Sequence, residues 1–196
     1  MPLSAPSRRV LQHVRDIRFR SFEREDGLLD IEGELVDEKP HDIVLHGEHP
    51  VPAHVPIHHM WIRATIDGKF RVVAIEAAMD RHPLGHCPEA ARALQKMVGQ
   101  QMGRGWRKAI NENLGTVAGC THLRELLANM ATAAFQTNHQ AFYPEDPSLP
   151  PVNLGQCLGW DFNGPGVARY FPQFIGYEPT KRAGAAIKNV ATNQQG

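Results

Sequence analysis

Apolar and polar residues alternate in the N-terminal part of the chain, which is typical of strands with one buried face. Ile17 and Phe19 fall on one parity, and Arg18 and Arg20 fall on the other. The alternation recurs over residues 29–34 and stops before a Lys-Pro turn. Two strands are therefore predicted before residue 40.

Two further apolar runs, residues 57–66 and 70–78, predict a hairpin. Asp67-Gly68 joins them, and both residue types tolerate the positive φ angles that tight hairpin turns need. Residues 40–56 are interrupted by prolines, which a central strand does not accommodate. We therefore expect four antiparallel strands, with residues 40–56 as a long loop.

The pattern changes to a helical period after residue 86. Cys87-Pro88-Glu89 is typical of a helix start, and this helix is predicted to end near Gly99. A second helix is predicted from Arg104 to just before Gly115, and the longest from Thr121 to about Gln140. Thr121 is the candidate N-cap of the longest helix. Its apolar positions form one stripe: Leu123, Leu126, Leu127, Met130 and Ala134.

These elements predict an α+β fold in a single domain over residues 1–196, with about four strands followed by three helices. The strand-rich part spans residues 8–80 and the helical part residues 87–141. Residues 144–178 begin with a proline-rich linker and are rich in aromatic residues, so we expect them to pack back on the body. Residues 180–196 form a polar tail.

Charge and composition exclude several function classes. Lys+Arg and Asp+Glu both number 21, so the net charge is zero, whereas a nucleic-acid-binding protein is usually basic. No apolar run is long enough to span a membrane, and the N-terminus lacks a signal-peptide pattern. Three cysteines do not make a disulfide scaffold, so we expect a cytoplasmic protein.

Histidine is the unusual residue of this chain. There are 11 histidines, and six of them fall between residues 41 and 59. Histidine changes its charge near neutral pH and is the commonest metal ligand. The six are His41, His46, His49, His54, His58 and His59.

Cys120 lies at the predicted start of the longest helix, within Gly119-Cys120-Thr121-His122. Partial positive charge at a helix start lowers the pKa of a nearby thiol, so Cys120 is a candidate nucleophile or ligand. The alternative is a small buried cysteine beside a helix cap, and spacing alone favours that alternative.

A zinc site is the second candidate. Cys120, His122, Cys87, His86 and the loop histidines are acceptable ligands, but none has a paired zinc-motif spacing. Such a site requires these residues to converge in space.

Two further patterns carry charged residues. In Gly103-Arg104-Gly105-Trp106-Arg107 the arginines can grip a carboxylate or phenolate, or the segment is a helix–helix turn with Trp106 in the core. Asp30 and Glu32 share one strand parity, which is typical of a solvated strand face. His58 grouped with Arg63, Asp30 or Glu32 would make an acid/base set if the strands pair suitably.

Five segments together resemble the bacterial domain-of-unknown-function family 2889, over roughly residues 8–178. They are DGLLDIEGELVDEK, IHHMWIR, CPEAARALQKMVG, GRGWRKAINENLGTVAGCTHLRELL and ATAAFQT. The resemblance implies family-pattern positions at Asp30, Glu32, His58, Arg63, Cys87, Trp106, Arg107, Cys120 and His122. The chain departs from the family pattern at His59, where an Asp is usual, and at Leu158, where a His usually follows the Cys.

The resemblance also implies a link to aromatic catabolism. We expect a cofactor-independent acid/base lyase that acts on an aromatic compound, such as a lignin-derived dimer that releases formaldehyde. His58 or His59 would be the base, because a histidine pKa lies near operating pH, and Arg63 an anion partner. The expected substrate-binding residues are Arg107, Trp106, Asp30, Cys120 and His122, and no metal or other cofactor is expected.

The alternative is a non-catalytic ligand- or metal-binding protein, or a zinc-dependent hydrolase. A small aromatic partner and a homo-oligomer are expected, with no nucleic acid and no membrane.

Overall fold

The computed structural model of the chain describes residues 3–44, 49–138 and 143–179. It divides the chain into two compact units, residues 1–139 and 140–196. The predicted tail, residues 180–196, and His46 lie outside the described residues. A single domain in which residues 144–178 pack against the body stays a prediction.

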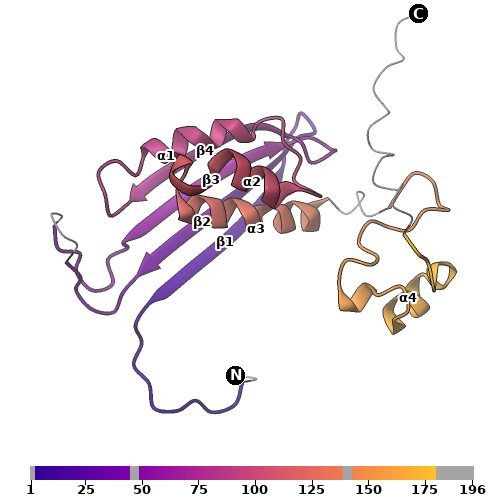
Figure 1. Cartoon of the computed structure of the whole chain (residues 1–196), viewed down its shortest axis with the longest axis horizontal. Coiled ribbons are helices and arrows are strands. Elements are labelled where there is room, and N and C mark those ends of the chain that lie inside the picture. The colour runs from indigo at the N-terminus through magenta and orange to yellow at the C-terminus, as the bar shows by residue number, and fades with distance from the viewer. Residues whose placement is uncertain (1–2, 45–48, 139–142, 180–196) are drawn as a thin grey trace, which may run out of the picture. The chain divides into compact units, whose positions relative to one another are not determined.

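The first unit contains a four-stranded antiparallel sheet in the order β1-β2-β3-β4 (Figure 1). This confirms the predicted α+β class with strands first and helices after them. The strands are β1 (Val14–Glu23), β2 (Leu29–Glu38), β3 (His58–Ile66) and β4 (Val72–Arg81).

The predicted hairpin joins β3 to β4. Its connection spans residues 67–71, so it is longer than a two-residue turn. Asp67 organises it, because its Oδ1 accepts hydrogen bonds from the backbone N–H groups of Lys69 (2.9 Å) and Arg71 (2.8 Å). Phe70 adopts a φ of +60°, which closes the turn.

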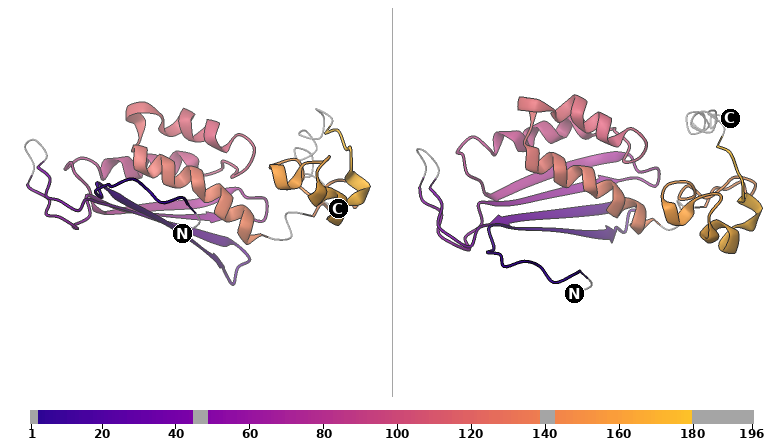
Figure 2. Two further views of the ribbon diagram at one scale, coloured as in Figure 1. Left: turned by 90° about the horizontal axis from the view of Figure 1, so that it is seen from below. Right: turned by 60° about the horizontal axis from the view of Figure 1, so that its bottom comes forward.

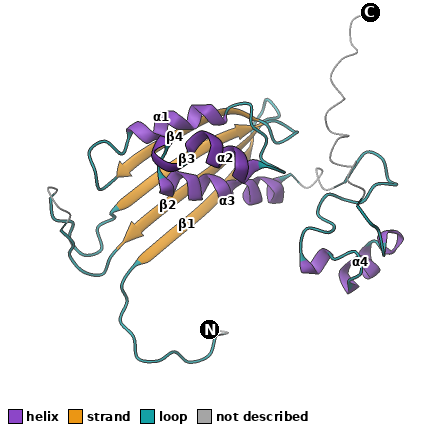
Figure 3. Cartoon of the chain, in the orientation of Figure 1, coloured by secondary structure: helices purple, strands orange, loops and turns teal. Residues whose placement is uncertain are grey.

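Helices follow the strands and lie together on one face of the sheet (Figures 2 and 3). Helix α3 packs against β1, β2 and β3, while α1 and η1 pack against β4 and α2 packs against α3. They are α1 (Glu89–Ala93), η1 (Leu94–Met97), α2 (Trp106–Leu114), η2 (Thr116–Ala118) and α3 (Thr121–Thr137).

The helix predicted over residues 87–99 is divided into α1 and the 3-10 helix η1. Leu94 and Met97 are both buried, and residues three apart lie on the same side of a 3-10 helix. The side-chain amide of Gln95 donates to the carbonyl oxygen of Ile75 in β4 at 2.6 Å. Burial and this bond favour the tighter helix.

Helix α3 approaches the sheet closely at Gly33. A Cβ atom at this position would lie 3.0 Å from Leu126 Cδ1 and 3.0 Å from Phe19 Cε1. Ile31, Leu35, Met60, Ile62 and Leu126 are at most 1% exposed around this contact. We call this side of the sheet, marked by Ile31, Leu35 and Met60, the covered face; the other side, marked by Glu32, Trp61 and Arg63, is the open face.

The second unit contains η4 (Leu158–Trp160), α4 (Pro165–Tyr170) and η5 (Pro172–Phe174). Its own core consists of Leu154, Phe162, Val167 and Phe174, and Trp160, Phe171 and Tyr177 pack against it. These five aromatic residues therefore form or flank a core within the unit.

None of the helices in the described residues combines the length and the apolarity needed to cross a bilayer.

Candidate functional site

Asp37 is the centre of a polar cluster on the covered face. It is 2% exposed, at the end of the β2 row that contains Ile31 and Leu35. Arg15 is its register partner on β1 and donates two hydrogen bonds, from Nε to Oδ1 at 2.7 Å and from Nη2 to Oδ2 at 2.9 Å. His13 Nε2 lies 2.9 Å from Oδ1. Burial opposes ionisation of Asp37, but the Arg15 and His13 contacts outweigh it and lower the pKa below its ordinary value.

His58 faces Asp37 from β3, where the two residues are register partners. Its Nδ1 lies 3.2 Å from Asp37 Oδ2 but is too poorly aligned for a hydrogen bond, and this buried atom has no hydrogen-bond partner in the described structure. Burial, followed by the charge of His122, lowers the pKa of His58 to about 4, although Asp37 acts in the opposite direction. His58 is therefore a neutral imidazole at pH 7.

His122 completes the arrangement from the first turn of α3. Its ring centroid lies 3.8 Å from that of His58, and its Nε2 lies 3.7 Å from Asp37 Oδ2. Its other nitrogen, Nδ1, lies 3.8 Å from the sulfur of Cys120. We refer to Asp37, His58, Cys120 and His122 as the Asp37 cluster.

Cys120, and not the predicted Thr121, is the N-cap residue of α3. The backbone of Cys120 is extended, and Thr121 is already the first helical residue. The hydroxyl of Thr121 instead accepts a hydrogen bond from Arg124 Nη2 at 3.3 Å. Burial opposes ionisation of the Cys120 thiol. Interactions with the His122 side chain and with the backbone N–H groups of Leu123 and His122 outweigh burial and lower the pKa of the thiol.

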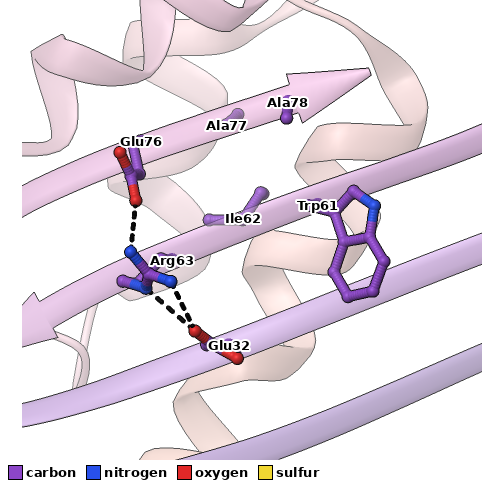
Figure 4. A pocket seen from close by; sticks show the side chains of 7 residues that line it. All are labelled: Glu32, Trp61, Ile62, Arg63, Glu76, Ala77 and Ala78. Atoms are coloured by element: carbon purple, nitrogen blue, oxygen red, sulfur yellow. Dashed lines mark hydrogen bonds and ion pairs between the residues drawn. The ribbon is translucent and has the colours of Figure 1, made fainter. Parts of the chain in front are cut away.

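The open face holds His59 and Arg63, which lie at positions of the same parity on β3. His59 Nε2 lies 3.1 Å from Glu34 Oε1, and its ring centroid lies 5.1 Å from that of Trp61. Arg63 lies between two carboxylates, 2.8 Å from Glu32 and 2.6 Å from Glu76, as Figure 4 shows.

A shallow depression of about 350 Å³, the open-face pocket, surrounds Arg63 (Figure 4). Its lining residues are Glu32, Trp61, Ile62, Arg63, Glu76, Ala77 and Ala78.

The predicted grouping of His58 with Arg63, Asp30 or Glu32 is wrong. Arg63 does pair with Glu32, but His58 points to the opposite face of the sheet. Asp30 accepts a hydrogen bond from the Thr65 hydroxyl at 2.6 Å on the open face. Adjacent strand residues face opposite sides, so the predicted catalytic residues are divided between two surfaces.

Trp106 and Arg107 are neighbours in sequence but have different surroundings. Trp106 is 3% exposed, and its indole N–H donates to the carbonyl oxygen of Leu127 at 3.0 Å. This corrects the substrate-binding expectation for Trp106, because its polar atom and ring are used by the core. Arg107 lines a depression with Thr121, Arg124 and Glu125, and Glu125 also pairs with Arg15 at 2.6 Å.

Three metal-ligating side chains converge in the Asp37 cluster. The ligand atoms of Asp37, His58 and His122 all lie within 4.8 Å of one another, and this is the one such group among the described residues. Of the predicted zinc ligands, His122 belongs to this group and Cys120 touches it, whereas Cys87 and His86 do not belong to it.

Asp37 and Arg15 are the site residues that sequence reasoning missed. The alternation of β2 could have identified Asp37, because Asp37 has the same parity as the inward-facing Ile31 and Leu35. Since β2 runs on to Glu38, its last inward position is a carboxylate. The predicted strand ended too early to include it.

The chain matches the family model described as a protein of unknown function (DUF2889) over residues 13–136. This region includes the four strands and nearly all of α3, and therefore the whole Asp37 cluster. No curated protein and no solved structure matches the chain.

Proposed function

The chain belongs to the DUF2889 family, whose function is unknown, and we propose from its site geometry that it binds one divalent metal ion of the zinc class through Asp37, His58 and His122. Of the functions that the sequence left open, this geometry favours a metal-dependent enzyme, with hydrolysis as its reaction class.

The spacing of the ligand atoms supports the proposal. Zinc lies about 2.0–2.2 Å from nitrogen and oxygen ligands, so two ligand atoms of a tetrahedral site are about 3.4 Å apart. Asp37 Oδ2 lies 3.2 Å from His58 Nδ1 and 3.7 Å from His122 Nε2. Both distances are within a few tenths of an ångström of that spacing, and the ligand atoms of His58 and His122 lie within 4.8 Å of each other.

The carboxylate of Asp37 has room for one more partner. A carboxylate offers roughly four acceptor positions. Arg15 occupies two of them and His13 a third. The fourth, on Oδ2, is near both histidines and accepts no hydrogen bond from either.

The unpartnered Nδ1 of His58 is the observation that carries the proposal. Buried polar atoms are normally paired, so an orphaned nitrogen beside a carboxylate needs an explanation. The pKa of His58, about 4, keeps this imidazole neutral, which is the form that binds metals. A divalent ion would accept the free lone pair and relieve the unpaired nitrogen.

Three protein ligands leave a coordination position free for water or substrate, which is the arrangement of catalytic rather than structural zinc sites. An ion in such a site lowers the pKa of a bound water to about 7 and polarises a carbonyl group. Asp37 would be oriented for this role by Arg15 and His13, as carboxylate ligands commonly are by neighbouring donors.

Zinc binding to the full chain tests the proposal. The chain, stripped with a chelator and dialysed against zinc, should retain one equivalent. His58→Gln should lose most of it, because an amide is a poor substitute for imidazole. His59→Gln is the matched control, one residue away on the open face, and should bind as the wild type does. Absence of zinc from the wild type, or an equal loss in both variants, contradicts the proposal.

A second candidate is the lyase expected from the sequence, acting at the open-face pocket on a small aromatic compound. Trp61 offers a flat ring, and His59 with its Glu34 partner is an acid/base group beside that ring. His59 would remove the proton of a primary alcohol. The C–C bond would then break to release formaldehyde, and the electron pair would leave with a phenolate or enter the ring.

Formaldehyde release from phenolic dimers tests this candidate. If His59 is the base, His59→Ala should lower turnover by about a hundredfold or more, and His58→Ala should have little effect. Equal turnover in both variants and the wild type would exclude the open-face base.

The homo-oligomeric state expected from the sequence stays a prediction.

A further inference from the structure

His122 has a different neighbour at each ring nitrogen. Nε2 faces Asp37 Oδ2 at 3.7 Å, and Nδ1 faces Cys120 Sγ at 3.8 Å. A neutral imidazole carries its proton on one nitrogen and its lone pair on the other. Which nitrogen is available to a metal is therefore decided by the partner of the other nitrogen.

The sulfur of Cys120 lies beside one edge of the His122 ring. It is 3.8 Å from Nδ1 at the start of α3, which is within hydrogen-bonding reach for sulfur. A metal bound to the lone pair of Nε2 requires the proton of His122 to be on Nδ1. The sulfur of Cys120 is then the acceptor that the Nδ1–H group faces.

The sulfur itself lies outside the set of convergent ligands. Asp37, His58 and His122 are the three residues whose ligand atoms all lie within 4.8 Å of one another, and Cys120 is not among them. Cys120 is also fixed as the N-cap residue, with φ −91° and ψ 134°, so its position follows from the start of the helix.

We propose that Cys120 is a positioning residue: it accepts the Nδ1–H of His122 and so presents Nε2 to the metal, without binding the metal itself. This inference rests on the proposed metal site. Neighbours that orient a metal-binding histidine typically change metal affinity by about 10- to 100-fold when they are removed. The thiol would thereby connect the start of α3 to the affinity of the site.

Cobalt titration of the full chain separates a positioning cysteine from a ligand cysteine. A thiolate bound to Co²⁺ produces an intense near-ultraviolet charge-transfer band. We expect the wild type to bind one Co²⁺ without that band. A charge-transfer band that disappears in Cys120→Ser overturns the inference while leaving a metal site in place, and failure of the wild type to bind Co²⁺ overturns the metal site as well.

Affinity provides the second readout. Cys120→Ala should weaken Co²⁺ binding by about 10- to 100-fold, and Cys120→Ser should recover part of it, because a hydroxyl also accepts a hydrogen bond. Cys87→Ser is the control, since Cys87 is outside the convergent group. Unchanged affinity in Cys120→Ala overturns the inference.

The tautomer of His122 shows which ring nitrogen binds the metal, and this measurement uses the wild type alone. In the zinc-loaded chain, long-range proton–nitrogen spectra should assign the proton of His122 to Nδ1 and the metal to Nε2. Metal at Nδ1 contradicts the proposal even if every Cys120 variant fails to fold.

Discussion

His58 and His59 are neighbours in sequence on the two faces of one sheet, and their surroundings differ in almost every respect. His58 is packed against His122 and Asp37 under α3, with a buried nitrogen that lacks a hydrogen bond. His59 lies on the open face with Glu34 at 3.1 Å. The difference shows that helix cover, and not residue type, makes a histidine chemically unusual here.

The two faces differ in the same way in the surroundings of two arginines. Arg15 and Arg63 each bridge a pair of carboxylates. The Arg15 pair includes Asp37, whose side chain is 3% exposed, whereas the carboxylates of Glu32 and Glu76 are 25% and 68% exposed. Because solvent screens the open-face ion pairs, they should contribute less to the free energy of unfolding than the Arg15–Asp37 pair, despite similar distances.

The largest expected effect is at the covering helix. Leu126→Ala removes a fully buried side chain above Gly33 and should destabilise the protein by about 2–5 kcal/mol, because it leaves a cavity. Denaturant unfolding measures this free energy. Val117→Ala, at a fully exposed position, should change it by less than about 0.5 kcal/mol. Similar effects at both positions would mean that α3 does not cover the sheet.

Removal of Arg15 comes next. Arg15→Ala leaves the buried Asp37 carboxylate without its cation and should cost about 3 kcal/mol in unfolding free energy. The double variant Arg15→Ala/Asp37→Asn should lose less than the sum of the two single variants, since the unpaired charge is gone. Strict additivity in this cycle would show that the two residues do not interact.

Acid should destabilise the metal-free protein through His58. Its pKa is 6.5 when unfolded and about 4 when folded, so between these values the unfolded chain binds the extra proton. The free energy of unfolding should therefore fall as the pH decreases from 6.5 to 4, by at most about 3 kcal/mol. Above pH 6.5 His58 is neutral in both states and adds no pH dependence.

The comparison with His58→Gln isolates this effect. The variant should lack the His58 part of the acid sensitivity, while carboxylates with low pKa values, such as Asp37, contribute only at lower pH. Identical pH profiles for the two proteins between pH 6.5 and 4 would contradict a buried neutral His58.

The smallest expected effect is on the open face. Arg63→Ala should change the unfolding free energy by less than about 1 kcal/mol, because its pairs with Glu32 and Glu76 are solvent-exposed. Thermal unfolding of Arg63→Ala beside Arg15→Ala measures the contrast between the faces. A loss as large as that of Arg15→Ala would remove the distinction.

The strands were predictable because their signals are local. Alternation identified β1 and β2, and Asp67-Gly68 identified the β3–β4 connection. The pairing of β2 with β3 is not local, since residues 39–57 separate them, and only that register brings Asp37 opposite His58. The sequence therefore predicted His58, His122 and Cys120 by residue type but not their convergence.

The metal assignment itself is tested most directly by X-ray absorption at the zinc edge of the zinc-loaded chain. We predict only nitrogen and oxygen neighbours at about 2.0–2.2 Å, including two imidazoles, and loss of most of this zinc signal in His58→Gln. His59→Gln should leave the spectrum unchanged. A sulfur neighbour at about 2.3 Å, or a wild-type spectrum that His58→Gln does not alter, would contradict a site formed by Asp37, His58 and His122.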